Sequence, residues 1–426
     1  MDFRIFPPQE LLQARIKLPL SKSISNRLLI INALTRGGVR PAELAECDDT
    51  RAMLRALDAP QESTIDIGAA GTAMRFLTAY FAATPGCTVT LDGTERMRRR
   101  PIAPLVDALR AIGADISYAG SEGFPPLRIS GRKLQGGSVT MPATVSSQFI
   151  SAMMMIAPVT EQGVEITLDG EAISTPYIRM TAELMGRMGA EVTLGNGVIT
   201  VGARPYTYAP VHVEADWSAA SYWYEIQALS SGFVTLDGLE RQSIQGDSRV
   251  AQIFHHLGVN TEYEGEEGGT DLEATPDCSP RLIADMTDTP DLVQTVVVTC
   301  VLLNIPFRLT GTGSLRIKET DRLEALRREM LKLGTTITIE GDDTITYECD
   351  RFPITEIPEF DTYDDHRMAM SLAPAALYVP GIVIRHPEVV SKSYPGFWDD
   401  LQSAGFTIAD AAAPLPSPDD CENARQ

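Results

Sequence analysis

The chain has 426 residues, of which 44% are hydrophobic and 22% are charged, and its net charge is −21 at pH 7. This length and composition are typical of a globular protein with two domains, not of a disordered one. The strongly negative charge argues against nucleic acid or an anionic membrane surface as the main partner. The six cysteines form no CxxC pair and the five histidines form no HxxxH pair. We therefore expect free thiols in a reducing cytoplasm and no metal site.

The first ten residues, MDFRIFPPQE, lack a basic segment followed by an apolar run. We therefore expect no signal peptide. The longest apolar run worth testing, Val293 to Phe307, contains Gln294 and Asn304 and is shorter than the ~20 residues that a bilayer requires. It predicts a buried helix and no membrane association.

A short pattern, an apolar turn followed by glycine and a strand-like stretch, recurs along the chain. The glycines are Gly113, Gly189, Gly258, Gly334 and Gly405. Their intervals are near-equal, at roughly 70 residues, which indicates a repeated unit. Glycine just after an amphipathic helix favours a left-handed helix cap, so each copy predicts a helix end before a strand. A degenerate sixth copy, LRALDAPQ at 54–61, has Asp58 in place of glycine.

The starts of these amphipathic helices are also readable. Asp247 and Thr320 are plausible N-caps of two of them. A second helix, apolar on most faces and therefore interior, precedes each amphipathic one. The predicted interior helices cover 23–34, 71–83, 146–157, 217–229, 290–303 and 365–377. Segments with alternating hydrophobicity, such as 87–93 and 164–170, predict strands between the helices. The chain thus reads as six α/β units in two similar domains that join near Glu214 to Ser218.

Polar motifs lie at or just before the starts of these helices. The motifs are Ser21-Lys22-Ser23-Ile24-Ser25-Asn26-Arg27, Ala70-Gly71-Thr72, Arg98-Arg99-Arg100-Pro101, Ser146-Ser147-Gln148, Ser174-Thr175-Pro176-Tyr177, Asp285 to Asp291, Lys318-Glu319-Thr320-Asp321-Arg322 and Asp364-Asp365-His366-Arg367. Taken singly, each is typical of an ordinary helix cap or a solvated charged face, and we expect at most one of the three arginines in a site. Together, converging helix starts would form a local anion site inside an acidic chain.

The ordered set KSxSNR, AGTAMR, RPIxPLVDAL, SSQF, TPYI, PD, KETDR, DHRMAM and a late lysine, Lys392, resembles the 5-enolpyruvylshikimate-3-phosphate synthases from about Leu18 to Phe406. The resemblance implies two domains, each of three βαβαββ units with buried helices, in the inside-out α/β barrel of the enolpyruvyl transferases. It implies one domain at 21–214 and another formed by 1–20 and 215–410. The tail, 411–426, is rich in Ala, Pro and Asp, so we expect it to be disordered.

The resemblance also implies a reaction in which the 5-hydroxyl of shikimate 3-phosphate attacks C2 of phosphoenolpyruvate and phosphate leaves, without metal or organic cofactor. By motif position, Asp291 is the base, and Glu319 and Lys22 exchange protons around C3 and the leaving phosphate. The residues implied to hold phosphoenolpyruvate are Lys22, Gly71, Arg100, Gln148, Arg322, Arg367 and Lys392. Those implied to hold shikimate 3-phosphate are Lys22, Ser23, Arg27, Ser146, Ser147, Gln148, Ser174, Asp291 and Lys318. We expect a cytoplasmic monomer.

The sequence departs from the family pattern at a few positions. Ala69 stands where an asparagine is usual, and Ser314 replaces another asparagine, but no charged candidate is lost. Two alternatives stay open. One is the sister transferase acting on UDP-N-acetylglucosamine, which usually carries a loop cysteine, for which only Cys87 is remotely placed. The other is a non-catalytic anion-binding protein on the same scaffold.

Overall fold

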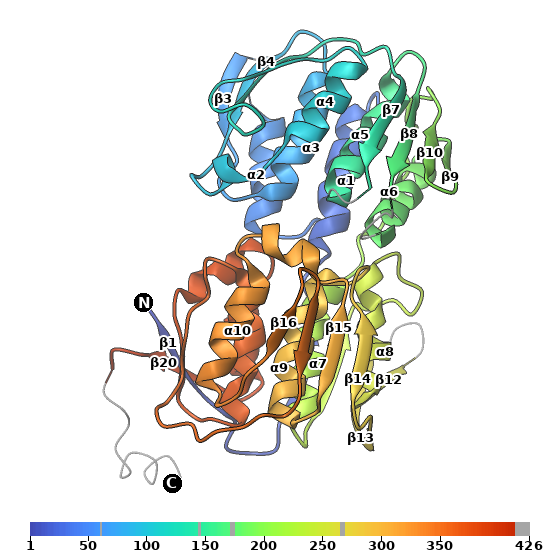
Figure 1. Cartoon of the computed structure of the whole chain (residues 1–426). Helices are drawn as coiled ribbons and strands as arrows, with labels where there is room; N and C mark the ends of the chain where they lie inside the picture. Colours follow the sequence, from blue (N-terminus) through green and yellow to red (C-terminus); the bar gives the residue numbers. More distant parts are fainter. Residues whose placement is uncertain (60–61, 144–145, 171–174, 265–268, 414–426) are drawn as a thin grey trace.

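The computed structural model describes residues 1–59, 62–143, 146–170, 175–264 and 269–413. Figure 1 shows two bodies stacked end to end. The hydrophobic core divides in the same way. One cluster runs from Ile24 to Val213, and the other combines Ile5 to Leu18 with Ala215 to Phe406. We call the bodies around these clusters the upper half and the lower half, respectively.

Interior and amphipathic helices alternate along the chain, as the sequence predicts. The interior helices are α1 (Lys22–Leu34), α3 (Gly71–Ala82), α5 (Ser147–Ile156), α7 (Trp217–Leu229), α9 (Val293–Leu303) and α11 (His366–Leu372). The amphipathic helices are α2 (Asp48–Leu57), α4 (Ala103–Ala111), α6 (Thr175–Arg187), α8 (Val250–His255), α10 (Arg322–Lys332) and α12 (Phe397–Ser403). Apolar residues cover most faces of the first group, so these helices are buried in the two cores.

The described residues form five four-stranded sheets that share one topology, in which a parallel pair is followed by two antiparallel neighbours. In the upper half they are β3 (Glu62–Asp66), β4 (Thr88–Asp92), β6 (Leu127–Ser130) and β5 (Asp115–Tyr118), then β7 (Gly137–Pro142), β8 (Val164–Asp169), β10 (Val198–Val201) and β9 (Val192–Leu194). In each unit an interior helix precedes the second strand of the parallel pair, and an amphipathic helix leads on to the antiparallel part of the sheet. Each sheet with its two helices is a βαβαββ unit.

The three sheets of the lower half follow the same order. They are β2 (Gln13–Lys17), β11 (Phe233–Asp237), β13 (Thr270–Cys278) and β12 (Leu257–Tyr263), then β14 (Leu282–Asp285), β15 (Phe307–Thr310), β17 (Thr344–Tyr347) and β16 (Thr338–Glu340), then β18 (Glu359–Phe360), β19 (Ile382–Ile384), β1 (Phe3–Phe6) and β20 (Thr407–Asp410). The N-terminal strands β1 and β2 therefore complete two sheets whose other strands come from the second part of the chain.

The five repeat glycines adopt the predicted left-handed conformation. Their φ angles lie between 71° at Gly334 and 101° at Gly113. Asp58, the residue of the degenerate copy, has a right-handed φ of −88°. That copy belongs to α1 and α2, and the segment between them, 35–47, contains no strand, nor does 202–214, part of which lines a hollow with residues from 39–43. The sixth unit thus keeps its two helices without a sheet of its own.

Two predicted helix caps are wrong. The N-cap of α10 is Asp321 rather than Thr320, because the Asp321 side chain accepts from the backbone N–H of Glu324 at 3.2 Å. Asp247 lies in a 3₁₀ turn, η3 (Gly246–Arg249), and its side chain accepts a hydrogen bond from Ser218 of α7. The other 3₁₀ turns are η1 (Met97–Arg99), η2 (Ala157–Val159), η4 (Pro290–Leu292), η5 (Gly313–Ile317), η6 (Ala373–Leu377) and η7 (Pro387–Lys392).

Within the described ranges, no helix is long and apolar enough to cross a membrane. The described cysteines, Cys47, Cys87, Cys278, Cys300 and Cys349, are free thiols. Most of the tail expected to be disordered, residues 414–426 with Cys421, lies outside the described residues.

Candidate active site

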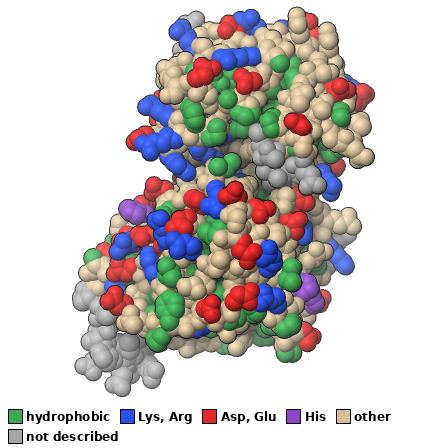
Figure 2. All heavy atoms as spheres, in the orientation of Figure 1, with side chains coloured by type: hydrophobic (Ala, Val, Ile, Leu, Met, Phe, Trp, Pro, Cys, Tyr) green, Lys and Arg blue, Asp and Glu red, His purple; other side chains and the backbone are tan. Residues whose placement is uncertain are grey.

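Except for Lys392, the predicted site residues that the structure describes line a cavity of about 250 Å³ between the two halves, at the waist visible in Figure 2. The first residues of α1, α3, α5, α10 and α11 line it. Helix N-termini carry free N–H groups and partial positive charge, which suit phosphates and carboxylates. The lining cations outnumber the lining carboxylates and are Lys22, Arg27, Arg75, Arg100, Lys318, Arg322 and Arg367. The site is locally positive inside an acidic chain.

A larger hollow, of about 770 Å³, lies beside the two chain crossings at Leu18 to Leu20 and Val213 to Ala215. Its lining mixes side chains of both signs, such as Arg51 and Glu43, and includes none of the predicted site residues. The predicted residues therefore favour the smaller cavity as the candidate active site.

Lys22 is the first residue of α1, just after the N-cap Ser21, whose hydroxyl accepts from the N–H of Ile24. Its ammonium nitrogen lies 3.6 Å from a carboxylate oxygen of Asp49. Burial favours the neutral amine, but the neighbouring acidic groups, Asp49 first and then Cys47 and Glu319, together outweigh it and raise the pKa of Lys22 above its ordinary value. Lys22 is therefore a protonated ammonium at neutral pH.

Arg100 lies against the start of α3. A methyl group at Gly71 would sit 2.5 Å from Nη1 of Arg100, so glycine at this position makes room for the guanidinium. Arg75, one turn into α3, donates to the carbonyl oxygens of Gly71 and Pro101 at 3.2 and 3.3 Å. Burial, followed by the charge of Arg100, lowers the pKa of Arg75 well below its ordinary value. Arg75 ends the AGTAMR motif and is an additional site residue that the motif alone did not single out.

Arg27 is held from several sides inside the upper half. It donates to the hydroxyls of Thr181 and Ser151 at 2.7 and 3.1 Å and to the carbonyl oxygen of Ser23 at 3.0 Å. Burial lowers its pKa to about 10, so the guanidinium stays charged at neutral pH. With this many protein partners, Arg27 is fixed in place before any ligand binds.

The start of α5 adds neutral donors to the same cavity. Ser146 caps the helix by accepting from the N–H of Gln148, and Ser147 is its first residue. The amide of Gln148 donates to the hydroxyl of Thr72 at 3.1 Å and so links α5 to α3. Ser174, another predicted contact, lies outside the described residues.

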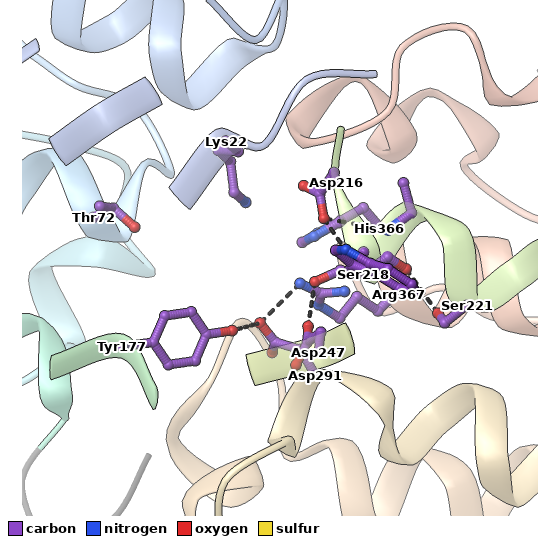
Figure 3. Close-up of polar contacts among 12 residues, drawn as sticks. Lys22, Thr72, Tyr177, Asp216, Ser218, Ser221, Asp247, Asp291, His366 and Arg367 are labelled. Carbon is purple, nitrogen blue, oxygen red and sulfur yellow. Dashed lines mark hydrogen bonds and ion pairs between the residues drawn. The ribbon is translucent and has the colours of Figure 1, made fainter. Parts of the chain in front are cut away.

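Asp291 is the centre of the charge network in the lower half (Figure 3). Its two carboxylate oxygens lie 3.0 Å from Nη1 of Arg322 and 2.8 Å from Nη2 of Arg367. Tyr177 reaches across from α6 and donates its hydroxyl to the second oxygen at 3.2 Å. Burial alone raises the pKa of Asp291, but the charges of Arg367 and Lys318 outweigh it and hold the pKa well below its usual range.

Glu319 forms a second ion-pair centre. One carboxylate oxygen lies 2.6 Å from Nζ of Lys392 and 3.9 Å from Nη1 of Arg100, and the other lies 3.2 Å from Nη2 of Arg322. Burial raises its pKa, but Lys392 and Arg322 outweigh burial and lower the pKa well below the ordinary value. Lys392 is absent from the cavity lining and enters the site through Glu319.

Arg322 links these two centres to a buried anchor. Its Nε donates to Asp365 at 2.6 Å, and Asp365 also caps α11 by accepting from the N–H of Arg367. The side chain of Arg322 is only 2% exposed. Carboxylates thus fix the orientation of the guanidinium groups of Arg322 and Arg367, and both groups are preorganised for an incoming anion.

Further residues join the site that the sequence analysis did not assign to it. Asp216 and Ser218, from the start of α7, and His366, from the start of α11, line the cavity. Asp247 lies beside them (Figure 3). Burial, then the nearby Asp291, raises the pKa of Asp247 to about 7. The signal for His366 was its place inside the DHRMAM motif, whereas nothing in the sequence distinguished Asp247 from a helix cap.

Known proteins resemble the chain over nearly its whole length. The family model of EPSP synthase (3-phosphoshikimate 1-carboxyvinyltransferase) matches residues 7–59 and 56–401. A 3-phosphoshikimate 1-carboxyvinyltransferase from Bacteroides fragilis is 53% identical over 96% of this chain and 99% of the relative. One from Methanoculleus marisnigri is 36% identical over 92% of this chain and 97% of the relative.

Solved structures agree with the fold. An EPSP synthase from Acinetobacter baumannii is 22% identical and matches with a TM-score of 0.75 over 96% of this chain and 100% of that chain. The expected α/β fold, an inside-out barrel with buried helices, is thereby confirmed. The chain therefore belongs to the EPSP synthase (3-phosphoshikimate 1-carboxyvinyltransferase) family and has that family's transferase activity in the shikimate pathway.

Proposed function

We propose that the cavity between the halves transfers the enolpyruvyl group of phosphoenolpyruvate to the 5-hydroxyl of shikimate 3-phosphate, with Asp291, Glu319 and Lys22 as its catalytic residues. The observation that carries this assignment is the gathering of buried carboxylates and cations from both halves around one cavity. Two phosphates and two carboxylates must be neutralised there, and water-excluded cations do so more strongly than solvated ones.

Asp291 is the base that takes the proton of the attacking hydroxyl. In the structure Arg322 and Arg367 hold it as a weak base, because they stabilise its ionised form. The carboxylate of phosphoenolpyruvate is the natural competitor for the same two guanidinium groups. When it binds there, it shares their charge, and the basicity of Asp291 rises as the substrate arrives.

The protonation states of Lys22 and Glu319 favour opposite roles for these two residues in proton transfer at C3. The pKa of Lys22 is raised and that of Glu319 is lowered, so the first carries a proton and the second does not. This supports Lys22 as the donor to C3 and Glu319 as the acceptor when the intermediate collapses. The chemistry needs both steps, because the proton added at C3 in the first half-reaction is removed in the second.

The binding contacts divide between the two ligands. Phosphoenolpyruvate is held by Arg322 and Arg367 at its carboxylate and by Lys22, Arg100, Lys392, Gln148 and the backbone at Gly71 at its phosphate. Shikimate 3-phosphate is held by Lys22, Ser23, Arg27, Gln148, Asp291 and Lys318, with Ser146, Ser147 and Ser174 on its phosphate. The packing of Arg100 on Gly71 supports the first set, and the exposed N–H groups at the start of α5 support the second.

The two halves act as domains, one at 21–214 and one formed by 1–20 and 215–410, that close on the ligands. The two separate hydrophobic cores support this division. Contacts across the cavity, from Tyr177 to Asp291 and from Thr175 to Asp288 at 2.9 Å, belong to the closed arrangement. Bound anions favour closure because they remove the repulsion between cations of the two halves. A smaller radius of gyration in small-angle scattering with both ligands is the expected result.

The enzyme works as a monomer in the cytoplasm. Residues from both halves of one chain line the cavity, so the site needs no second subunit to bring the two halves together, and the described cysteines are free. Light scattering coupled to gel filtration measures the mass in solution. A stable dimer would contradict the monomer.

The decisive assay measures phosphate release from phosphoenolpyruvate with shikimate 3-phosphate, and with UDP-N-acetylglucosamine in parallel. Release with the first acceptor only, together with the enolpyruvyl product mass, supports the proposed substrates over those of the sister transferase. Asp291→Asn then tests the base. We expect kcat to fall by about 10² to 10⁴ while calorimetric binding of shikimate 3-phosphate persists. Unchanged turnover would remove Asp291 from the mechanism.

A further inference from the structure

Arg96 reaches from the upper half onto the backbone of the lower half. It precedes η1, and Met97, its neighbour, belongs to the upper core. Its Nε donates to the carbonyl oxygen of Glu319 at 3.0 Å, and its Nη2 donates to that of Lys318 at 3.2 Å. One guanidinium group therefore bridges two consecutive peptide units on the other side of the cavity.

The segment that Arg96 holds carries two of the site's charged side chains. Lys318 follows η5 in an extended conformation, with φ −77° and ψ −155°, and Glu319 lies just before the α10 cap. Outside a helix, the peptide planes here are not fixed by a hydrogen-bond ladder. The two bonds from Arg96 orient both planes, and the planes set the directions in which the two side chains leave the backbone.

The neighbouring arginines show that this contact is particular to Arg96. Arg98 pairs with Asp92 at 2.5 Å, and Arg99 pairs with Glu95, so both stay within the upper half on its surface. Arg100 enters the cavity and faces the carboxylate of Glu319. The 318–319 segment is thus gripped twice from the upper half, by Arg96 at its carbonyls and by Arg100 at its acidic side chain.

We infer that Arg96 is a positioning residue that couples closure of the two halves to the placement of Lys318 and Glu319 in the site. Its own side chain is not among the described residues that line the cavity, so it acts through the segment it holds. Because its donors and acceptors belong to different halves, the two bonds form only when the halves meet. The inference rests on the proposed closure and adds a residue to it.

The test compares Arg96→Met with Arg99→Met, a change of the same kind one turn away at an exposed ion pair. With both substrates saturating, we expect kcat of Arg96→Met to fall at least roughly 10-fold, because each of the two lost hydrogen bonds has a charged donor. The kcat of Arg99→Met should equal that of the wild type. The melting temperatures of both variants should also equal that of the wild type. Arg96→Lys, which keeps a charge and one donor, should recover part of the loss. Added guanidinium should partly restore Arg96→Ala.

Equal kcat values for Arg96→Met and Arg99→Met would overturn the positioning role. So would a loss that neither Arg96→Lys nor free guanidinium reduces, since that result indicates a structural defect. Small-angle scattering of the wild type with and without both ligands tests closure separately, through the change in radius of gyration. Without compaction, the link to closure is wrong, whatever the rate of the Arg96 variants. With compaction and unchanged Arg96→Met, closure stands and the role of Arg96 falls.

Discussion

Replacing Gly71 with alanine tests the phosphate side of the cavity with a single methyl group. The new Cβ would lie 2.5 Å from Nη1 of Arg100 and 3.1 Å from its Cζ. An unstrained contact requires about 3.5 Å, so the guanidinium must withdraw by about 1 Å. A charge-assisted hydrogen bond contributes about 1.5–3 kcal/mol, so its loss should raise KM for phosphoenolpyruvate roughly 10- to 150-fold. Binding of shikimate 3-phosphate, which is assigned to other residues, should be unchanged.

Stability separates this effect from general damage. Gly71 is the first residue of α3, where alanine favours the helix by up to about 1 kcal/mol. The melting temperature of Gly71→Ala should therefore equal or exceed that of the wild type. Gly186→Ala is the matched control, because a Cβ there meets no atom within 4 Å. Steady-state kinetics with each substrate varied in turn measure both KM values. If KM for phosphoenolpyruvate is the same in Gly71→Ala and Gly186→Ala, Arg100 does not hold the phosphate.

Three further predictions use the site's charges and hydrogen bonds. Tyr177→Phe removes the hydroxyl that donates to the ionised carboxylate of Asp291, and kcat/KM should fall roughly 10- to 150-fold; an unchanged value would mean that this hydrogen bond does not contribute to the reaction. Lys392→Met removes the cation nearest Glu319 and should raise the pKa of that carboxylate. The limb of the kcat–pH profile that Glu319 sets should then move to higher pH. An unmoved limb would mean that Lys392 does not control the ionisation of Glu319. The folded-state pKa of Asp247 is raised to about 7, so its protonation stabilises the fold at low pH and the benefit disappears as pH rises through about 7. The difference in melting temperature between the wild type and Asp247→Asn, measured across this pH range, should show that loss. If the two melting temperatures change with pH in parallel, the prediction is wrong.

The repeated units could be predicted because their signals are local. Each of the five glycines adopts a left-handed backbone at a helix end, and this conformation can be predicted from the adjacent residues alone, without knowledge of distant contacts. The interior helices were readable for a similar reason, since a helix apolar on most faces has no other stable environment in water. The site followed from motifs at helix starts, where backbone N–H groups are free.

What could not be predicted depends on contacts between distant segments. Asp247 looks like a helix cap in the sequence, and only the approach of Asp291 and Ser218 makes it a buried acid of the site. Arg96 looks like one more surface arginine until the two halves are placed together. Among the described residues, α1 and α2 lack a sheet of their own. Asp58 in place of glycine hints at this irregularity, but a single substituted glycine does not specify the loss of a sheet.

The position of β1 between β19 and β20 has a consequence for synthesis on the ribosome. Arg4 of β1 donates to the carbonyl oxygen of Gly381, 377 residues along the chain. The upper core, from Ile24 to Val213, is contiguous in sequence, so it can form while translation continues. The first strand must then wait, unpaired, until nearly the whole chain has emerged. We therefore expect protease protection of nascent chains to appear in the upper half first and at the N-terminal strand last, the reverse of the order in which the two are made.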